Sequence, residues 1–583
     1  MRGLPPRPNK HDTRVTFFHL PEPIGLAQAL GAGQFAAKPL DQKRPRVMDR
    51  YDYIIIGAGS AGCVLASRLT ADGKTTVLLL EAGGKDNSIL VKMPAGVGAL
   101  IKDKNAYNWG FWTESEPHLE DRKLWWPRGK GWGGSSSING MIYIRGHARD
   151  YDQWRQMGLS GWSYAEVLPY FKRSETLDTG GDDYHGGEGP LFVSHASTPN
   201  PIFSTFIKAG EQAGYKVTAD FNGYQQEGFG PYQLTIKDGA RWSAAKGYLH
   251  PIKDIRPNLT TQIDARTTRI LIEDGRAVGV EYAQGKKAKR TSVYAKSEVL
   301  LCAGAVQSPH ILQLSGIGDP EALAKVGMPV VHALPGVGKN LQDHLDVIVS
   351  WECTQPITAY AYNKGLNKLV TGINYLLRGQ GPGRQNFLES GAFLKSRPDL
   401  DRPDLQLHFL IAIMKEHGKV IIEKDGFSAH ICQLRPESRG EVKLKSLDPF
   451  DDPAILANYL ATDEDRRALR EGVRMIRAVV AQSAFDELRG PEFQPGTDVQ
   501  TDEQLDAWIR QTAETIYHPV GTCRMGPAGD EMAVVDETLC VHGLKGLRVV
   551  DASVMPTLVG GNTNAPTIMI ATLAAAMILE TAR

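Results

Sequence analysis

The sequence predicts an α/β Rossmann-like domain joined to a second, α+β domain built on an antiparallel sheet. Three observations support this prediction. A chain of 583 residues is too long for a single compact core. A strand, a glycine-rich turn, a helix and a second strand follow one another between residues 51 and 80. Strand-rich sequence then follows Asp404, far from the first unit.

The composition excludes several classes of protein. A hydrophobic content of 42% and a charged content of 23% are typical of a soluble globular protein. Lys and Arg number 66, as do Asp and Glu, so no net charge attracts nucleic acid or an anionic membrane. The six cysteines form no C-x-x-C pair, which argues against a disulfide framework or a zinc site, and no metal site is predicted. No run of 18 apolar residues predicts a transmembrane segment.

Residues 1–47 differ from the rest of the chain. They are rich in Pro and Gly, carry eight Lys or Arg against three acids, and lack the apolar stretch of a secretory signal. One interpretation is a targeting or disordered N-terminal extension. The other is that translation begins at Met48, because Met48 is followed directly by the first predicted strand. We favour the second interpretation.

The first part of the chain is predicted to form a βαβ unit. Residues 51–56 are β-branched and aromatic, as in a buried parallel strand. A glycine-rich turn at 57–62 leads into a predicted helix at 63–69, and a second buried strand at 75–80 ends at Glu81.

Later elements alternate in a similar way. Strands are predicted at 298–302 and 547–550, and a helix at 566–581. Thr462, followed by three acids, predicts the start of another helix. The apolar stripe of that helix is Leu469, Val473, Ile476 and Val480. Residues 359–402 are rich in Pro, Gly and Asn and are predicted to form long loops. The predicted division assigns 48–150, 228–345 and 510–583 to the first domain, and 151–227 and 346–509 to the second.

The glycine-rich turn has the spacing of a dinucleotide site. In Gly57-x-Gly59-x-x-Gly62 the first glycine allows a tight turn, the second a close approach of backbone N–H groups to a pyrophosphate, and the third helix–strand packing. The helix N-terminus supplies partial positive charge for the phosphates. Glu81 lies where an acid bonds ribose hydroxyls and repels a 2′-phosphate, which disfavours NADP. NAD and FAD both remain open on these residues.

Three further segments carry a family resemblance. The first is Gly129-Lys-Gly-Trp-Gly-Gly-Ser-Ser-Ser-Ile-Asn-Gly-Met141. The second is Gly304-Ala-Val-Gln-Ser-Pro-His-Ile-Leu-Gln-Leu-Ser-Gly-Ile-Gly318. The third is the C-terminal region, which contains His518-Pro-Val-Gly-Thr-Cys-Arg-Met-Gly526, Asp551-Ala-Ser553 and Gly561-Asn-Thr-Asn564. In order and spacing they resemble the two signatures and the catalytic C-terminus of the glucose–methanol–choline (GMC) flavoprotein family. The resemblance extends from about Tyr51 to the last residue.

The resemblance implies that the cofactor is FAD. Some relatives attach FAD covalently through a histidine at the position of Ile138, and isoleucine has no nucleophilic atom, so we expect noncovalent FAD. Backbone at Gly133-Gly134-Ser135 is expected to approach the flavin, and Thr267 to lie against the adenine. The residues expected to bind FAD are Gly57, Ala58, Gly59, Ser60, Ala61, Glu81, Ala82, Gly133, Gly134, Ser135, Asn139, Gly140, Met141, Thr267, Asp551, Ala552, Asn562 and Thr563.

The resemblance also implies the chemistry. Alcohol oxidation removes a hydride, which goes to flavin N5, and a hydroxyl proton, which needs a base active near neutral pH. His518 is the expected base and Asn562 its partner at the substrate oxygen, although Asn562 could instead cap the last helix. His408 and His430, with Glu389, lie in the region that shapes the substrate pocket, but structural roles are at least as expected for them.

The expected substrate is a small primary alcohol, oxidised to its aldehyde. The C-terminal motif resembles the aliphatic-alcohol branch of the family more than the choline branch. Oxidation of choline to betaine aldehyde is the alternative, and a non-redox, flavin-binding lyase is a third hypothesis. The resemblance favours a dehydrogenase whose electron acceptor is a carrier such as a quinone. A cytoplasmic location is expected, with peripheral contact at the inner membrane left open.

Overall fold

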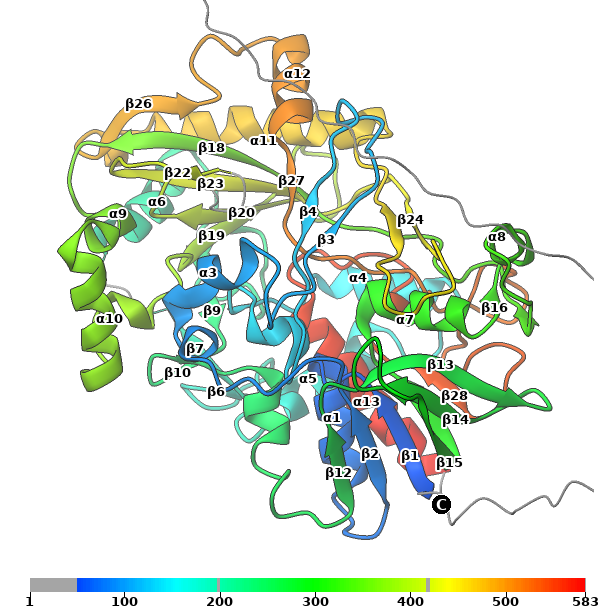
Figure 1. Ribbon diagram of the computed structural model, residues 1–583. Helices are drawn as coiled ribbons and strands as arrows, with labels where there is room; N and C mark the ends of the chain where they lie inside the picture. Colours follow the sequence, from blue (N-terminus) through cyan, green and yellow to red (C-terminus); the bar gives the residue numbers. More distant parts are fainter. Residues whose placement is uncertain (1–49, 197–199, 416–419, 582–583) are drawn as a thin grey trace, which may run out of the picture. The chain divides into compact units, whose positions relative to one another are not determined.

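A computed structural model describes residues 50–196, 200–415 and 420–581. The predicted extension at 1–47, with the proposed start at Met48, lies outside the described residues. Met48–Arg583 forms one compact unit. The division of this unit into two domains remains a prediction, but two large sheets organise it (Figure 1).

The first sheet contains the predicted βαβ unit. Its strands run in the order β12-β2-β1-β15-β14-β13, and β28 also pairs with β15. The pairs that join β12, β2, β1, β15 and β28 are parallel, whereas β13 and β14 pair antiparallel, so the sheet is mixed. The strands are β1 Arg50–Ile56, β2 Val77–Leu80, β12 Leu259–Gln262, β13 Arg266–Glu273, β14 Arg276–Ala283, β15 Thr291–Leu301 and β28 Leu547–Val549.

Two helices pack against each other in the core of this sheet. α1 (Ser60–Leu69) begins directly after Gly59, three residues earlier than predicted, and α13 (Asn564–Thr581) begins two residues before Pro566, which the first turn tolerates. α13 is also long and apolar enough to cross a membrane by length and composition. However, 67% of it is buried within the protein, as in a core helix.

The second sheet is antiparallel throughout, as predicted. Its order is β26-β18-β23-β20-β19-β8, with β27 also paired to β18. The strands are β8 Gly228–Pro231, β18 Leu345–Cys353, β19 Ser390–Leu394, β20 Leu405–Leu410, β23 Gly426–Gln433, β26 Arg489–Gln494 and β27 Glu514–Thr515. β8 and β27 come from segments assigned to the first domain, so the chain crosses between the sheets more often than the predicted division allows.

The two faces of the second sheet differ because side chains alternate along each strand. On β20, Leu405, Leu407 and Phe409 enter a core that includes α6 (Pro201–Gln212) and α11 (Asp463–Val480). Gln406 and His408 point to the opposite face, which is the face of the functional site. The helix predicted after Thr462 is α11, and its predicted apolar stripe is buried.

The prediction of long loops at 359–402 was wrong. This segment forms α9 (Ala359–Asn363), α10 (Leu366–Arg378) and strand β19. Gly381, Pro382 and Gly383 lie between α10 and β19, whereas Gly372 and Asn374 lie within α10. α10 itself starts after Gly365 and ends at Gly379, which has the left-handed conformation that terminates helices.

Candidate active site

One cavity of about 1100 Å³ contains the predicted site. Its wall is formed by the dinucleotide turn after β1, by the start of α13, and by the polar face of the second sheet. Ligand sites in α/β folds lie at the carboxyl ends of parallel strands, and β1, β2 and β15 each end at this cavity.

The glycines of the turn allow close backbone packing. A Cβ at Gly62 would lie 1.9 Å from the carbonyl oxygen of Gly57, so α1 approaches its strand more closely than any side chain permits. Gly59 faces Gly134 across the turn, and a Cβ on Gly134 would lie 2.8 Å from the Cα of Gly59. The loop at 129–141 therefore contacts the dinucleotide turn through the backbone of its glycines.

Glu81 ties these two loops together. Its carboxylate accepts hydrogen bonds from the backbone N–H groups of Ala58 (2.8 Å), Gly83 (2.7 Å) and Gly131 (2.9 Å). A carboxylate has about four acceptor positions, so one position remains for a ribose hydroxyl. Burial raises the pKa of Glu81, and the three N–H groups oppose that effect.

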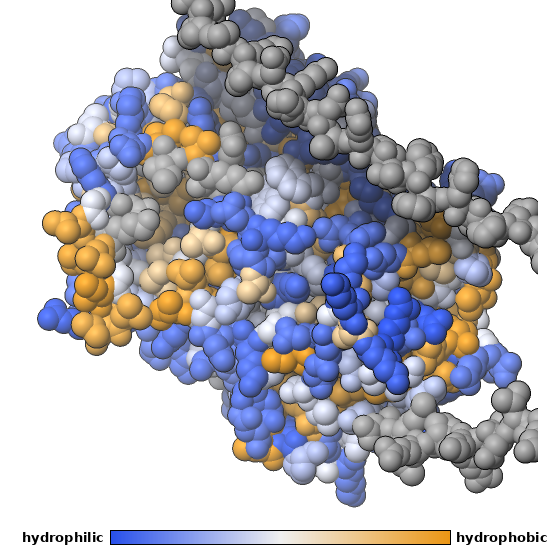
Figure 2. All heavy atoms as spheres, viewed as in Figure 1, coloured by the Kyte–Doolittle hydropathy of each residue, from blue (hydrophilic) through white to orange (hydrophobic). Residues whose placement is uncertain are grey.

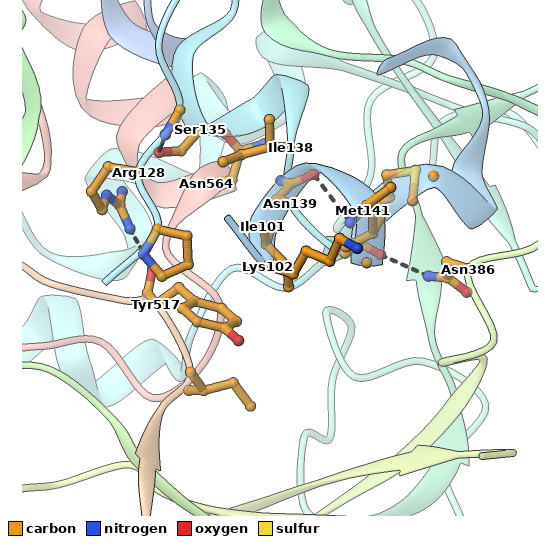
Figure 3. A pocket seen from close by; sticks show the side chains of 18 of the residues that line it. Ile101, Lys102, Arg128, Ser135, Ile138, Asn139, Met141, Asn386, Tyr517 and Asn564 are labelled. Atoms are coloured by element: carbon orange, nitrogen blue, oxygen red, sulfur yellow. Dashed lines mark hydrogen bonds between the residues drawn. The ribbon is translucent and has the colours of Figure 1, made fainter. Parts of the chain in front are cut away.

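Nearly all the residues expected to bind FAD line this cavity. Ala58 and Gly133 do not. They lie directly behind the wall, where the Gly133 N–H donates to the Ala58 carbonyl at 2.7 Å. The expected residues that line the cavity are Gly57, Gly59, Ser60, Ala61, Glu81, Ala82, Gly134, Ser135, Asn139, Gly140, Met141, Thr267, Asp551, Ala552, Asn562 and Thr563. Figure 3 shows Asn139 beside Met141, whose N–H donates to the Asn139 amide oxygen at 3.1 Å.

The wall fits a large polar cofactor. The buried Thr267 hydroxyl and the buried Gln307 amide nitrogen both line the cavity and have no hydrogen-bond partner in the described part of the chain. Buried polar groups without partners are unusual and indicate a missing ligand or solvent. Ile138, at the position of covalent attachment in some relatives, also lines the cavity.

The two predicted catalytic residues meet at the cavity wall. His518 Nε2 lies 3.1 Å from Asn562 Nδ2, although the residues are 44 positions apart in sequence. Gln406 Nε2 donates to Asn562 Oδ1 at 3.1 Å, which leaves the amide nitrogen of Asn562 facing the histidine. Asn562 therefore does not cap α13, and the side chain of Asn564 in turn accepts a hydrogen bond from the Ser60 hydroxyl.

A chain of hydrogen bonds determines the tautomer of His518. The Leu434 carbonyl can only accept, so His344 Nε2, at 3.2 Å, carries a proton. His344 Nδ1 of the neutral ring is then an acceptor, and it lies 3.0 Å from His518 Nδ1, which must donate. His518 Nε2 is consequently unprotonated. The Asn562 amide, which donates to the same nitrogen, requires the same tautomer.

His518 is also held electrostatically as a free base. Burial is the largest effect, and His344 and Arg128 add to it, so the pKa of His518 lies well below its ordinary value. Burial likewise lowers the pKa of His344 to about 3. Both rings are therefore neutral at neutral pH.

The backbone before His518 is strained. Tyr517 has a φ of 72°, a left-handed conformation that is unfavourable for an aromatic residue. The guanidinium of Arg128 donates to the Tyr517 carbonyl at 2.7 Å, as Figure 3 shows, and the Tyr517 N–H donates to the Thr515 hydroxyl. The His518 N–H donates to Asp343 Oδ1 at 2.7 Å. These bonds hold the imidazole at the cavity.

Several site residues were missed or not assigned a role from sequence, among them Gln406, which orients Asn562. His344 was missed, and so was Asp346, which faces the cavity and bonds His430 Nδ1 at 2.6 Å. His408 and His430 also line the cavity, opposite each other on β20 and β23. The signal available in sequence was polar residues inside otherwise apolar strands: Gln342-Asp-His344 leads into β18, and Asp346 interrupts it.

Comparisons with known proteins agree with this geometry. Residues 51–346 and 436–571 match the two family models described as GMC oxidoreductase. The chain belongs to the GMC oxidoreductase family. It is 52% identical to the oxygen-dependent choline dehydrogenase of Chromohalobacter salexigens, over 89% of this chain and 93% of that protein. It is 46% identical to the human mitochondrial choline dehydrogenase, over 95% and 93% of the two chains.

Solved structures show the same fold. The pyridoxine 4-oxidase from Mesorbium loti superimposes with a TM-score of 0.82 at 31% identity, covering 91% of this chain and 99% of that one. A formate oxidase superimposes with a TM-score of 0.85 at 26% identity, covering 92% and 99%. The GMC oxidoreductase described here is an FAD-dependent enzyme that oxidises CH–OH groups.

Proposed function

We propose that His518 is the general base and Asn562 the hydrogen-bond donor in the oxidation of a primary alcohol to an aldehyde. The observation that carries the proposal is the unprotonated Nε2 of His518, which meets the Asn562 amide at the cavity wall. A hydroxyl that replaces the direct Asn562–His518 bond donates to His518 Nε2 and accepts from Asn562 Nδ2. His518 Nε2 then takes the hydroxyl proton, while His344 keeps the ring oriented through Nδ1.

FAD fits the cavity, and bound FAD would supply the acceptor for the hydride. The turn at Gly57–Gly62, Glu81, Thr267 and the loop at 129–141 would hold it. We propose that it is bound noncovalently, because Ile138 offers no atom for attachment. Release of all the flavin by acid precipitation of the protein, with none left on the chain, tests this.

The His518→Ala variant tests the base. It removes the only group in the proposal that accepts the proton, so we expect kcat to fall by roughly three or more orders of magnitude while the flavin content stays at the wild-type level. Ile255→Ala, on an exposed side chain outside the cavity, is the matched control. Turnover within tenfold of the wild type would remove His518 from this role.

We propose that the alcohol is choline. Asp346 supports this, because it places a buried carboxylate in the cavity wall, where a quaternary ammonium needs a negative or aromatic partner. Burial raises the pKa of Asp346, while its contact with His430 opposes that shift. The names of the relatives at 46–52% identity point the same way. The resemblance of the C-terminal motif to the aliphatic-alcohol branch does not explain a carboxylate at this place.

The Asp346→Asn variant separates choline from aliphatic alcohols. The amide keeps the size of the side chain and a bond to His430 but removes the charge. We expect kcat/KM for choline to fall by about 100-fold, while kcat/KM for a medium-chain primary alcohol changes by less than about threefold. Equal losses for both substrates would reject a cation site at Asp346 without affecting the role of His518. A wild-type enzyme that prefers the neutral alcohol would reject choline itself.

We propose a quinone as the electron acceptor. The support is the resemblance to the dehydrogenases of the family. Comparing choline turnover in air with turnover under nitrogen, with and without a quinone analogue, tests the proposal. Turnover that depends on O₂ alone would contradict it.

A further inference from the structure

Helix α10 carries an apolar face that points to solvent. This face, called here the α10 face, consists of six side chains that are 45–80% exposed: Leu366, Leu369, Val370, Ile373, Leu376 and Leu377. The spacing of i, i+3, i+4 and i+7 places them along one side of the helix. In Figure 2 they form the orange group at the left, over α9 and α10.

The face is concentrated rather than scattered. Nineteen large hydrophobic side chains are exposed among the described residues, and six of them lie within the twelve positions from 366 to 377. Single exposed leucines are ordinary on protein surfaces, but a contiguous apolar patch marks an interaction site.

The helix is fixed with this face outward. Tyr375, on the opposite side, is 6% exposed, and its hydroxyl donates to the carbonyls of Lys92 and Gly239 at 3.3 and 3.2 Å. Thr371 donates to the Tyr362 carbonyl on the same inner side. An ordinary surface helix buries its apolar side and exposes its polar one. α10 instead exposes its apolar side, and the hydrogen bonds of Tyr375 and Thr371 hold it in this orientation.

The sequence around α10 is basic. Residues 353–388 contain four basic residues and no acid, in a protein whose net charge is zero. Arg378 ends α10, and Lys364 and Arg384 flank it. Aliphatic side chains beside Lys and Arg are the signature of a helix that lies in the interface of an anionic membrane.

We propose that the α10 face docks the enzyme on an anionic lipid bilayer. The face is about 20 Å long and about 10 Å wide, far smaller than the roughly 800 Å² per partner that a stable protein dimer buries. Docking on a membrane does not require a contact area of that size, because shallow insertion of a few leucines next to basic residues gives reversible binding. The docked helix lies at the cavity, since Lys364, Gly365, Thr371 and Gly372 line it. An acceptor dissolved in the bilayer would then be presented beside the cavity.

Vesicle binding of the full chain tests this proposal. The L369N/L377N variant removes two of the four leucines of the α10 face, and I255N/V331N is the matched control at exposed apolar residues outside α10. We expect wild type and control to co-sediment with phosphatidylcholine vesicles that contain phosphatidylglycerol, and L369N/L377N to bind at least tenfold more weakly. Omitting phosphatidylglycerol or raising the salt concentration should weaken wild-type binding.

Activity and mass measurements complete the test. None of the four substituted side chains lines the cavity, so both variants should keep wild-type turnover with a soluble dye acceptor, which shows that they fold. Equal vesicle binding by wild type and L369N/L377N would overturn the proposal. A wild type that does not bind vesicles, but whose solution mass is halved by L369N/L377N, would also overturn it and assign the face to a second copy of the chain.

Discussion

At the level of single residues, the proton on His518 is placed by groups that do not touch the substrate. The Leu434 carbonyl fixes the tautomer of His344, and His344 in turn fixes that of His518. On the other side, Gln406 orients the Asn562 amide. Both ends of this series of hydrogen bonds require His518 to carry its proton on Nδ1. The assignment of the tautomer therefore needs no assumption about a bound ligand.

We predict that His344 acts as a positioning residue. His344→Leu removes the acceptor for His518 Nδ1, so the wrong tautomer becomes populated and kcat should fall by about 10²- to 10⁴-fold with unchanged flavin content. His344→Gln offers an acceptor oxygen at a similar place and should recover part of the loss. Steady-state kinetics of the two variants check this. Equal kcat values for Leu and Gln would show that His344 only fills space.

The wild-type pH profile belongs to the same prediction. A base works only when unprotonated, and the pKa of His518 is lowered, so activity is retained as the pH falls through 6.5 and is lost only well below it. The acid limb of kcat/KM measures this directly. A limb at or above pH 6.5 would contradict the burial effect described for His518.

At the level of elements, local sequence signals predict secondary structure correctly where the structure of a segment depends mainly on its own residues. Thr462 caps α11 by accepting from the Asp465 N–H at 3.3 Å, as its sequence predicts, and the apolar stripe of that helix is buried. The same reasoning failed for residues 359–402. The glycines and prolines of that segment suggested loops, so the helix was missed. Its apolar side faces outward, contrary to the expectation for a soluble protein.

We predict that Thr462→Ala lowers the free energy of unfolding by about 1 kcal/mol, because it removes the cap of an 18-residue helix that packs on the second sheet. Urea denaturation followed by circular dichroism measures the change. Thr497→Ala, at an exposed position outside any helix, is the control and should stay within about 0.5 kcal/mol of the wild type. A loss no greater than that of the control would show that Thr462 contributes no cap.

At the level of the whole molecule, the active site needs both sheets. Asn562 comes from the chain that enters α13 beside the first sheet, whereas Gln406 and Asp346 come from strands of the second. The strands β8 and β27 cross from segments predicted for the first domain into the second sheet. The two sheets therefore share one site within a single compact unit.

We predict that a variant without residues 1–47 keeps flavin binding and turnover. Met48–Arg583 forms one compact unit and contains every residue assigned to the site. Flavin content and kcat should match those of the full chain within about twofold. Absorbance of the bound flavin and steady-state turnover check this, and loss of flavin on truncation would contradict it.

The sequence by itself determined the Rossmann-like unit and the FAD cofactor, and it predicted that His518 and Asn562 act together, because each depends on short motifs whose spacing fixes local backbone or carries a family resemblance. Only the tertiary structure placed His344, Gln406 and Asp346 at the site. These side chains meet their partners across 84 to 174 positions of sequence, which only the folded chain brings together. The outward face of α10 was also decided at this level, because the direction of an amphipathic helix depends on what it packs against and not on its own period.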